Sequence, residues 1–207
     1  MSVISESNST QRNWDLDKDI GLQTYKLILE ALTNAPSKQN LPFYKVHLIT
    51  DRNLIEKIHA NTYGYYDAQG IVRPNDQVLA NLLIAFEAYE EDNIKFYSDM
   101  DEDQYNNIVR RDQLMAVGIA SGYVNLIAHQ NGLKTGYCAC YLDEHVKALL
   151  KTDNEIISLL GVGYPDTSKH KDDSHVGDYK YTPQPGKKIQ VVHCLLYTSD
   201  AADERNS

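Results

Sequence analysis

Apolar and polar residues alternate along the chain with two different periods, which predict helices and strands in an interleaved order. From about Asp19, apolar residues recur at the spacing of a helix, at Leu22, Tyr25, Leu29 and Leu32. Pro36 ends this pattern, because a helix cannot continue through proline. Residues 44–49 alternate as a strand does, and Asp51 then caps a short helix over residues 54–58. The first dozen residues follow neither period, so we expect them to form an extended arm.

The rest of the chain continues this order around strongly apolar stretches. Residues 62–77 predict a loop, and residues 78–89 have the density of a fully buried strand, although their length also permits a helix. We favour the strand. The pattern then predicts a long helix, a strand, a short helix, a buried strand and a last strand, over residues 104–131, 135–142, 143–150, 155–165 and 188–192. Helices that alternate with buried strands indicate an α/β or α+β sheet covered by helices.

Small residues interrupt the long helix at Gly118 and Gly122. Small side chains let a neighbouring backbone approach closely, and in a membrane this spacing would favour helix pairing. The flanking segments are too polar for a membrane. We therefore expect tight packing, either inside a soluble core or at a dimer seam.

Composition narrows the class of protein. The 207 residues are 42% hydrophobic and 24% charged, which fits one globular domain. A net charge of −9 argues against nucleic acid or an anionic membrane as the main partner, because the mean field would repel phosphates. The chain has neither an apolar run of about 20 residues nor an apolar signal segment, so we expect a cytoplasmic protein and no membrane partner. Three cysteines fit a reducing compartment.

Three stretches offer candidate metal ligands, and for each the simpler interpretation is favoured. Cys138-Ala139-Cys140 provides only two thiols, whereas a structural zinc site needs about four ligands. The acidic residues of segment 87–103 are best explained as a solvated face or a mobile cover. The loop HKDDSH is interpreted as hydrophilic, although it could present His170, Asp172, Asp173 and His175 to a metal.

Four pieces of the sequence, taken in order, resemble the nitroreductase family, whose members are FMN enzymes and intertwined homodimers. SNSTQRNWD (7–15) is similar to the family's opening motif, and APSKQNLPFY (35–44) is similar to its Ala-Pro-Ser turn. AVGIASGYVNLIAHQNGL with the following GYCACYLDE resembles the small-residue helix and the strand at the flavin edge. SLLGVGYPD (158–166) is similar to its Leu-Gly-Tyr-Pro strand.

This resemblance implies an α+β nitroreductase-like fold, with a central, mostly antiparallel sheet covered by helices, in a single FMN-binding domain over residues 1–193. It implies an oxidoreductase that passes hydride from NADH or NADPH, bound transiently, through flavin N5 to a nitroaromatic, quinone or similar small acceptor. No side chain is assigned as a catalytic acid or base. Flavin-dependent dehalogenation or flavin breakdown are rival reactions in the same fold. A non-catalytic flavin-binding or structural homologue is the alternative from another class, and a metal-binding module is the third.

The resemblance assigns two residues of the arm to the FMN phosphate. Arg12 matches the last basic residue of the opening motif, and Thr10 matches its serine. The family usually begins this motif with arginine, where this chain has Asn8-Ser9. The loss of one charge-assisted hydrogen bond costs about 1.5–3 kcal/mol, so we expect weak FMN retention. Basic residues of the last strand are expected to supply the missing charge, namely Lys187 and Lys188.

The resemblance also assigns residues to the flavin ring. The amide of Ala139 is expected to face N5, with Cys138 and Cys140 packing beside the ring, where small residues let the backbone approach. Ser37 and Asn40 match groups at the phosphate end and ring edge. Asn75 and Gln77 lie near the family's polar contacts to the pyrimidine half. For each polar residue, a turn or capping role is the alternative, and for Ser37 it is nearly as favoured.

The last residues have a different character. CLLYTSDAADE (194–204) resembles the translation of a transposase adapter that is used in sequencing libraries. We therefore expect natural sequence to stop at about His193 and residues 194–207 to be a non-native tail.

Overall fold

The computed structural model describes residues 2–67, 69–89, 100–181 and 189–192. Its centre is a four-stranded sheet in the order β1-β4-β6-β5, in which every neighbouring pair is antiparallel. The four strands are β1 (Tyr44–Ile49), β4 (Leu82–Ala88), β5 (Lys134–Cys138) and β6 (Ile156–Gly163). A separate two-stranded hairpin pairs β2 (Tyr65–Tyr66) with β3 (Val72–Arg73). The α+β fold with an antiparallel sheet is confirmed.

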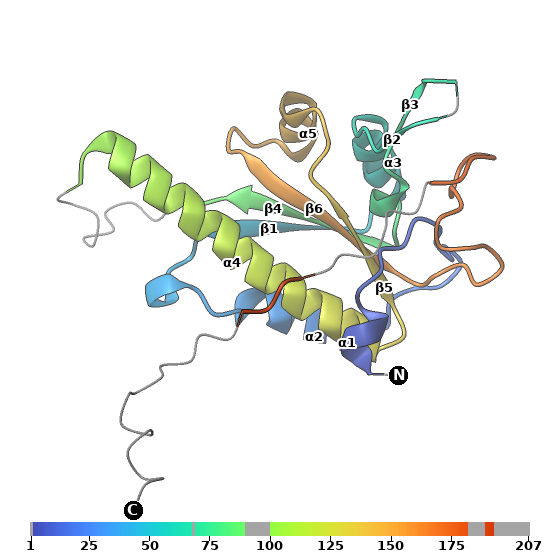
Figure 1. The fold of residues 1–207 in the computed structure, drawn as a ribbon, viewed down its shortest axis with the longest axis horizontal. Coiled ribbons are helices and arrows are strands. Elements are labelled where there is room, and N and C mark those ends of the chain that lie inside the picture. The colour runs from blue at the N-terminus through green and yellow to red at the C-terminus, as the bar shows by residue number, and fades with distance from the viewer. Residues whose placement is uncertain (1, 68, 90–99, 182–188, 193–207) are drawn as a thin grey trace, which may run out of the picture.

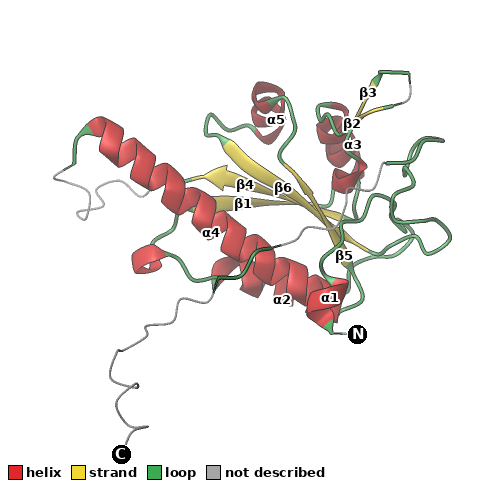
Figure 2. Ribbon diagram, in the orientation of Figure 1, coloured by secondary structure: helices red, strands yellow, loops and turns green. Residues whose placement is uncertain are grey.

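Helices lie on both faces of this sheet, as Figures 1 and 2 show. α2 and α4 cover one face, and α3 and α5 cover the other. The helices are α1 (Val3–Glu6), α2 (Leu22–Thr33), α3 (Arg52–Ala60), α4 (Glu102–Gln130) and α5 (Asp143–Leu150), with short 3-10 helices η1 (Lys38–Asn40) and η2 (Asp76–Val78). The Asp51 side chain accepts a hydrogen bond from the Leu54 amide, so the predicted cap of α3 is confirmed.

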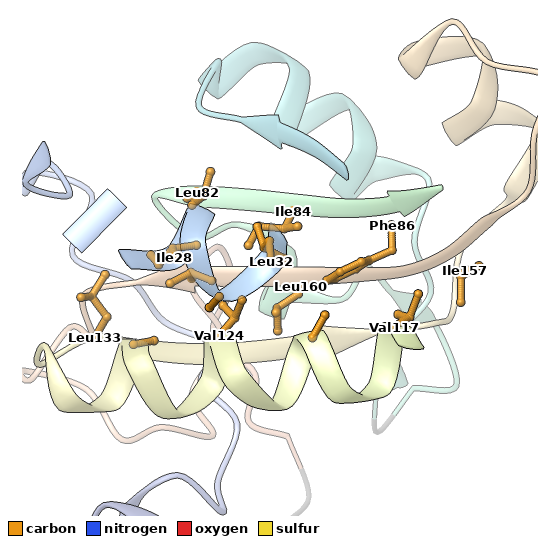
Figure 3. Packing of buried hydrophobic residues seen from close by; sticks show 14 residues of the cluster. Ile28, Leu32, Leu82, Ile84, Phe86, Val117, Val124, Leu133, Ile157 and Leu160 are labelled. Carbon is orange, nitrogen blue, oxygen red and sulfur yellow. The ribbon is translucent and has the colours of Figure 1, made fainter. Parts of the chain in front are cut away.

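The central strand β4 is buried on both faces, which explains its continuous apolar sequence. Leu82, Ile84 and Phe86 point into the core beneath α2 and α4, where Figure 3 shows them beside side chains of both helices. Leu83 and Ala85 point into the second core, beneath α3 and α5. The predicted strand is therefore confirmed, but it begins at residue 82 because residues 76–78 fold into η2 instead.

Some local predictions are wrong, including the loop expected over residues 62–77, which contains the short strands β2 and β3. Residues 3–6 of the expected arm form α1, because Ser2 caps this short turn and the Asn125 side chain of α4 holds the Ser7 carbonyl. Residues 189–192 form no strand, since their apolar side chains are exposed and find no partner in the described part of the chain; residue 188 lies outside it. Within the acidic segment, Glu87 is buried, with its carboxylate 2.6 Å from both His47 Nε2 and Asn154 Nδ2. Asp101, Glu102 and Asp103 are exposed, as the predicted solvated face requires.

The two glycines of α4 have no close neighbour in the part of the chain that the structure describes. A Cβ atom added at Gly118 or Gly122 would meet nothing within 4 Å. The expectation that they pack inside the core is therefore wrong, and the dimer seam stays a prediction. The same helix exposes large apolar side chains at Leu114, Met115 and Tyr123.

Candidate functional site

Three segments that are distant in the sequence meet at one end of the sheet: the N-terminal arm (residues 7–15), η2 and the edge strand β5. The Gln11 amide donates a hydrogen bond to the Thr135 carbonyl at 2.9 Å, which ties the arm to β5. Gly136 lies where the segments cross, because a Cβ there would come within 2.7 Å of Gln77 Cβ and 2.9 Å of the Gln11 carbonyl oxygen. Only glycine allows this approach. We call this region the arm junction.

The arm junction brings four of the predicted side chains near one another. Gln77 is buried, and its Nε2 lies 3.5 Å from Thr10 Oγ1. Asn75 is also buried, and its side-chain oxygen accepts a hydrogen bond from the Gln77 amide at 3.1 Å. Cys138 belongs to the same region, because it ends β5 two residues after Gly136, which lies against Gln77. These four residues come from the arm, η2 and β5.

The two cysteines at the end of β5 have opposite environments. Cys138 is 2% exposed, and its thiol points to the Cys140 carbonyl oxygen at 3.6 Å. Burial raises the pKa of Cys138 to about 11, so the thiol is neutral at physiological pH. Ala139 and Cys140 follow the last residue of the strand and are exposed. Cys138 thus behaves as a small apolar side chain.

This difference predicts selective alkylation. In the native protein at pH 7.5, iodoacetamide is expected to modify Cys140 and to spare Cys138, because the buried thiol is neither accessible nor ionised. Tandem mass spectrometry of the peptide that carries both residues distinguishes the two sites. In denaturant both should react, which serves as the control. Equal labelling of the native protein would contradict the described burial.

Arg12 leaves the arm on the side of a loop that follows β6. Its Nη1 lies 3.3 Å from Asp172 Oδ1, and its Cζ stands 4.7 Å from the centre of the Tyr181 ring. The Arg12 Nε is buried and has no hydrogen-bond partner in the described part of the chain. The side-chain oxygen of Gln77, Oε1, is likewise buried and without a hydrogen-bond partner among the described residues. Two of the predicted site residues thus retain buried hydrogen-bonding capacity that no described protein group uses.

A buried carboxylate holds that loop in place, and the sequence carried no signal for it. Asp76 is 0% exposed. Its Oδ2 accepts hydrogen bonds from Ser174 Oγ at 2.5 Å and the His175 amide at 3.0 Å, while its Oδ1 lies 2.8 Å from His59 Nε2. The Trp14 indole donates to the Asp76 carbonyl at 2.8 Å. Asp76 therefore joins η2, α3, the arm and the loop after β6.

Ser37 and Asn40 lie away from the arm junction. Ser37 Oγ donates to the Leu41 carbonyl at 2.7 Å, which is the turn role given as its alternative. η1 is anchored to α4 by Lys38 Nζ, 2.7 Å from Asp112 Oδ2, whereas the arm and β5 are anchored to Asn125. Asp112 and Asn125 are 13 residues apart in one helix, a separation of about 20 Å along its axis at about 1.5 Å per residue.

The other candidates are the lysines of the predicted last strand, the possible metal ligands and a membrane span. Lys187 and Lys188 lie outside the described residues, as does the tail from residue 194. The HKDDSH side chains enter ion pairs and hydrogen bonds, and no three His, Cys, Asp or Glu side chains of the described ranges are placed to hold a metal ion. Across the same ranges, none of the helices combines the length and apolar character that a membrane crossing requires.

The fold and the arm junction together define a class: an α+β protein that gathers polar side chains of its arm and of η2 beside the edge strand of an antiparallel sheet. The family model for the nitroreductase family matches residues 7–164. The chain belongs to the nitroreductase family. No relative was found among curated proteins.

Solved structures with the same fold come from several bacteria. A nitroreductase family protein from Clostridium novyi NT has a TM-score of 0.63 at 20% identity, over 82% of this chain and 88% of that chain. A protein described as a nitroreductase in complex with FMN, from Exiguobacterium sibiricum, has a TM-score of 0.58 at 17% identity, over 88% of this chain and 91% of that chain. A protein described as an NAD(P)H:FMN oxidoreductase, from Staphylococcus epidermidis, has a TM-score of 0.60 at 13% identity, over 81% of this chain and 87% of that chain. At such identities the likeness concerns the fold alone.

Proposed function

We propose that this protein is an FMN-dependent oxidoreductase that uses NADH or NADPH to reduce a nitroaromatic, quinone or similar small acceptor. The observation that carries the proposal is made at the arm junction and its border, where Gln77 Oε1 and Arg12 Nε are buried and have no hydrogen-bond partner among the described residues. Their chemistry fits FMN, because a guanidinium N–H suits a phosphate oxygen and an amide oxygen suits a pyrimidine N–H. The family membership and the FMN complex of the Exiguobacterium protein support the same cofactor.

In this proposal the flavin, when bound, supplies the hydride chemistry, and the chain supplies binding and orientation. Arg12 and Thr10 hold the phosphate, while Asn75 and Gln77 hold the pyrimidine half. The backbone amide of Ala139 faces flavin N5, and Ala139 is exposed directly after β5. Cys138 fills space beside the ring as a neutral thiol. No side chain is assigned as an acid or base.

We further propose that the protein is a homodimer in which each flavin site is completed across the seam. Within one chain, the contacts that anchor η1 and the arm to α4 are about 20 Å apart along that helix, so we assign Ser37 and Asn40 to the flavin site of the other chain. The partner's Ser37 and the partner's Asn40 would complete the site. The exposed apolar side chains of α4 and its uncovered Gly118 and Gly122 offer the surface for this seam.

The seam predicts a disruptive substitution. Met115 is 55% exposed and borders a cavity of about 250 Å³ beside Ser37, so Met115→Glu should not affect the fold of one chain. A buried carboxylate at the seam is costly, and we expect the variant to elute as a monomer in size-exclusion chromatography with light scattering. Tyr66→Glu is the matched control, since Tyr66 is 68% exposed on the β2–β3 hairpin. If the wild type is itself a monomer, the seam is wrong.

We also propose the cytoplasm as the location, residues 1–193 as one domain and residues 194–207 as an added tail. If residues 194–207 are an added tail, a protein that ends at His193 should have the same melting temperature as the full chain. A large loss of stability on removal would show that the tail belongs to the fold.

Anaerobic spectroscopy tests the function. Purified protein that is saturated with FMN should show oxidised flavin absorbance that bleaches when NADH or NADPH is added and returns when a nitroaromatic or quinone is added. A protein that binds FMN but is not reduced would be a non-catalytic flavin-binding homologue. A protein that does not bind FMN would be a structural homologue. Reduction without turnover of those acceptors would direct the search to dehalogenation or flavin breakdown.

A further inference from the structure

Asp172 faces the predicted phosphate ligand, and its charge bears on which flavin the site prefers. We propose that Asp172 is a specificity-determining residue that partly neutralises Arg12 and so weakens the preference for FMN over riboflavin, which lacks the phosphate. This inference rests on the proposed flavin-binding function and deepens it. It concerns how strongly the site takes the phosphorylated cofactor.

The geometry pairs one carboxylate with one guanidinium in a partly covered place. Arg12 Nη1 lies 3.3 Å from Asp172 Oδ1, and the two side chains are 20% and 5% exposed. The Tyr181 ring lies 4.7 Å from Arg12 Cζ, which leaves the guanidinium little freedom to turn away. Charges in such a covered place interact more strongly than exposed ones. A phosphate that approaches Arg12 must therefore share it with Asp172.

Asp172 cannot withdraw easily, because its backbone and its loop are tied down. The Tyr181 amide donates to the Asp172 carbonyl at 2.7 Å, and the Tyr181 hydroxyl donates to the Pro74 carbonyl at 2.9 Å. Asp76 holds Ser174 and the His175 amide of the same loop. The carboxylate thus stays beside Arg12 unless the loop itself opens.

Two other basic side chains lie near Asp172 but are more exposed than Arg12. His170 Nδ1 is 3.5 Å from Asp172 Oδ2, and Lys171 Nζ is 3.8 Å from Oδ1. Solvent screens both, so the pair with Arg12 dominates the local field. The arm also has Asn8-Ser9 where the family usually has arginine. A dianionic phosphate therefore meets a site whose one described arginine is already paired.

The adjacent Asp173 provides a control of equal charge. Its carboxylate is 35% exposed and pairs with Lys180 at 3.0 Å instead of Arg12. Asp173→Asn changes the net charge of the same loop by the same amount. A difference between the two variants therefore reports the contact with Arg12 and not the overall charge.

The test measures dissociation constants for FMN and for riboflavin by flavin fluorescence, in wild type, Asp172→Asn, Asp173→Asn, Arg12→Gln and Arg12→Gln/Asp172→Asn. We expect Asp172→Asn to tighten FMN about tenfold and riboflavin less than twofold. Asp173→Asn should change neither by more than about twofold. In the Arg12→Gln background, the effect of Asp172→Asn on FMN should fall to about threefold or less, because the pair no longer exists. Circular dichroism melting confirms that each variant is folded.

The other outcomes separate the inference from the proposed function. An unchanged FMN-to-riboflavin ratio in Asp172→Asn, with flavin still bound, overturns the inference alone. Weaker FMN binding with unchanged riboflavin binding also overturns it, since Asp172 would then position Arg12 for the phosphate. Equal changes for both flavins indicate a general effect on the fold and overturn it as well. If neither flavin binds to wild type or to any variant, the proposed function fails, and the inference fails with it.

Discussion

Replacement of Asp76 by alanine is expected to lower the free energy of unfolding by about 3–5 kcal/mol, which is a large part of the stability of an ordinary domain. Asp76 is fully buried, and its carboxylate satisfies Ser174 Oγ, the His175 amide and His59 Nε2. Alanine leaves these groups buried without a partner, and each such group costs about 1–3 kcal/mol. Urea denaturation followed by circular dichroism measures the change.

Asp173→Ala is the control for Asp76, because Asp173 is partly exposed and pairs with an exposed Lys180. Its loss should cost at most about 1 kcal/mol. Asp76→Ala should also loosen the loop after β6, which limited proteolysis between residues 166 and 181 would detect. A variant as stable as wild type would show that Asp76 does not join these segments.

Gly161→Ala is expected to have the second largest effect, on stability and on FMN together. A Cβ atom at position 161 would lie 2.1 Å from the Gln77 carbonyl oxygen, which is a backbone atom of η2. Either β6 or η2 must move, at a cost of about 1–3 kcal/mol or more. Because η2 carries Gln77 and follows Asn75, we expect FMN affinity to fall at least about tenfold, a change of about 1.4 kcal/mol.

Gly21→Ala is the matched control for Gly161. A Cβ atom at Gly21 meets nothing within 4 Å, and its φ of −60° suits any residue. It should therefore change stability by only about 1 kcal/mol or less and leave FMN affinity unchanged. Denaturation curves and flavin titrations on both variants make the comparison. If Gly161→Ala binds FMN as wild type does, η2 does not position the pyrimidine contacts.

The structure brings some of the predicted site residues together and leaves others apart. Thr10, Asn75, Gln77 and Cys138 are brought to one region, and Arg12 lies at its border, although these residues are far apart in the sequence. Ser37 and Asn40 are not brought there by their own chain. A motif identifies residue types in order along the chain, but it does not give the distances between their side chains after folding.

The sequence by itself determined the elements whose signals are local. The helical period of residues 22–32, the alternation of residues 44–49, the cap at Asp51 and the continuous apolar run before residue 89 each depend on neighbours within a few positions. Together with the family motifs, these signals were sufficient for the α+β class. They depend on backbone geometry and on the burial of one face, which the chain order encodes directly.

Only the tertiary structure decided the contacts between distant segments. No local pattern marks Asp76 as a buried carboxylate, since its partners His59 and Ser174 lie 17 and 98 positions away. The need for glycine at positions 136 and 161 comes from η2 packing against them, and the pairing of Arg12 with Asp172 spans 160 positions. Ile189, Val191 and Val192 suit a strand by residue type, but residues 189–192 form none, because no described strand edge pairs with them. Such features depend on which surfaces meet after folding, and the local sequence does not contain that information.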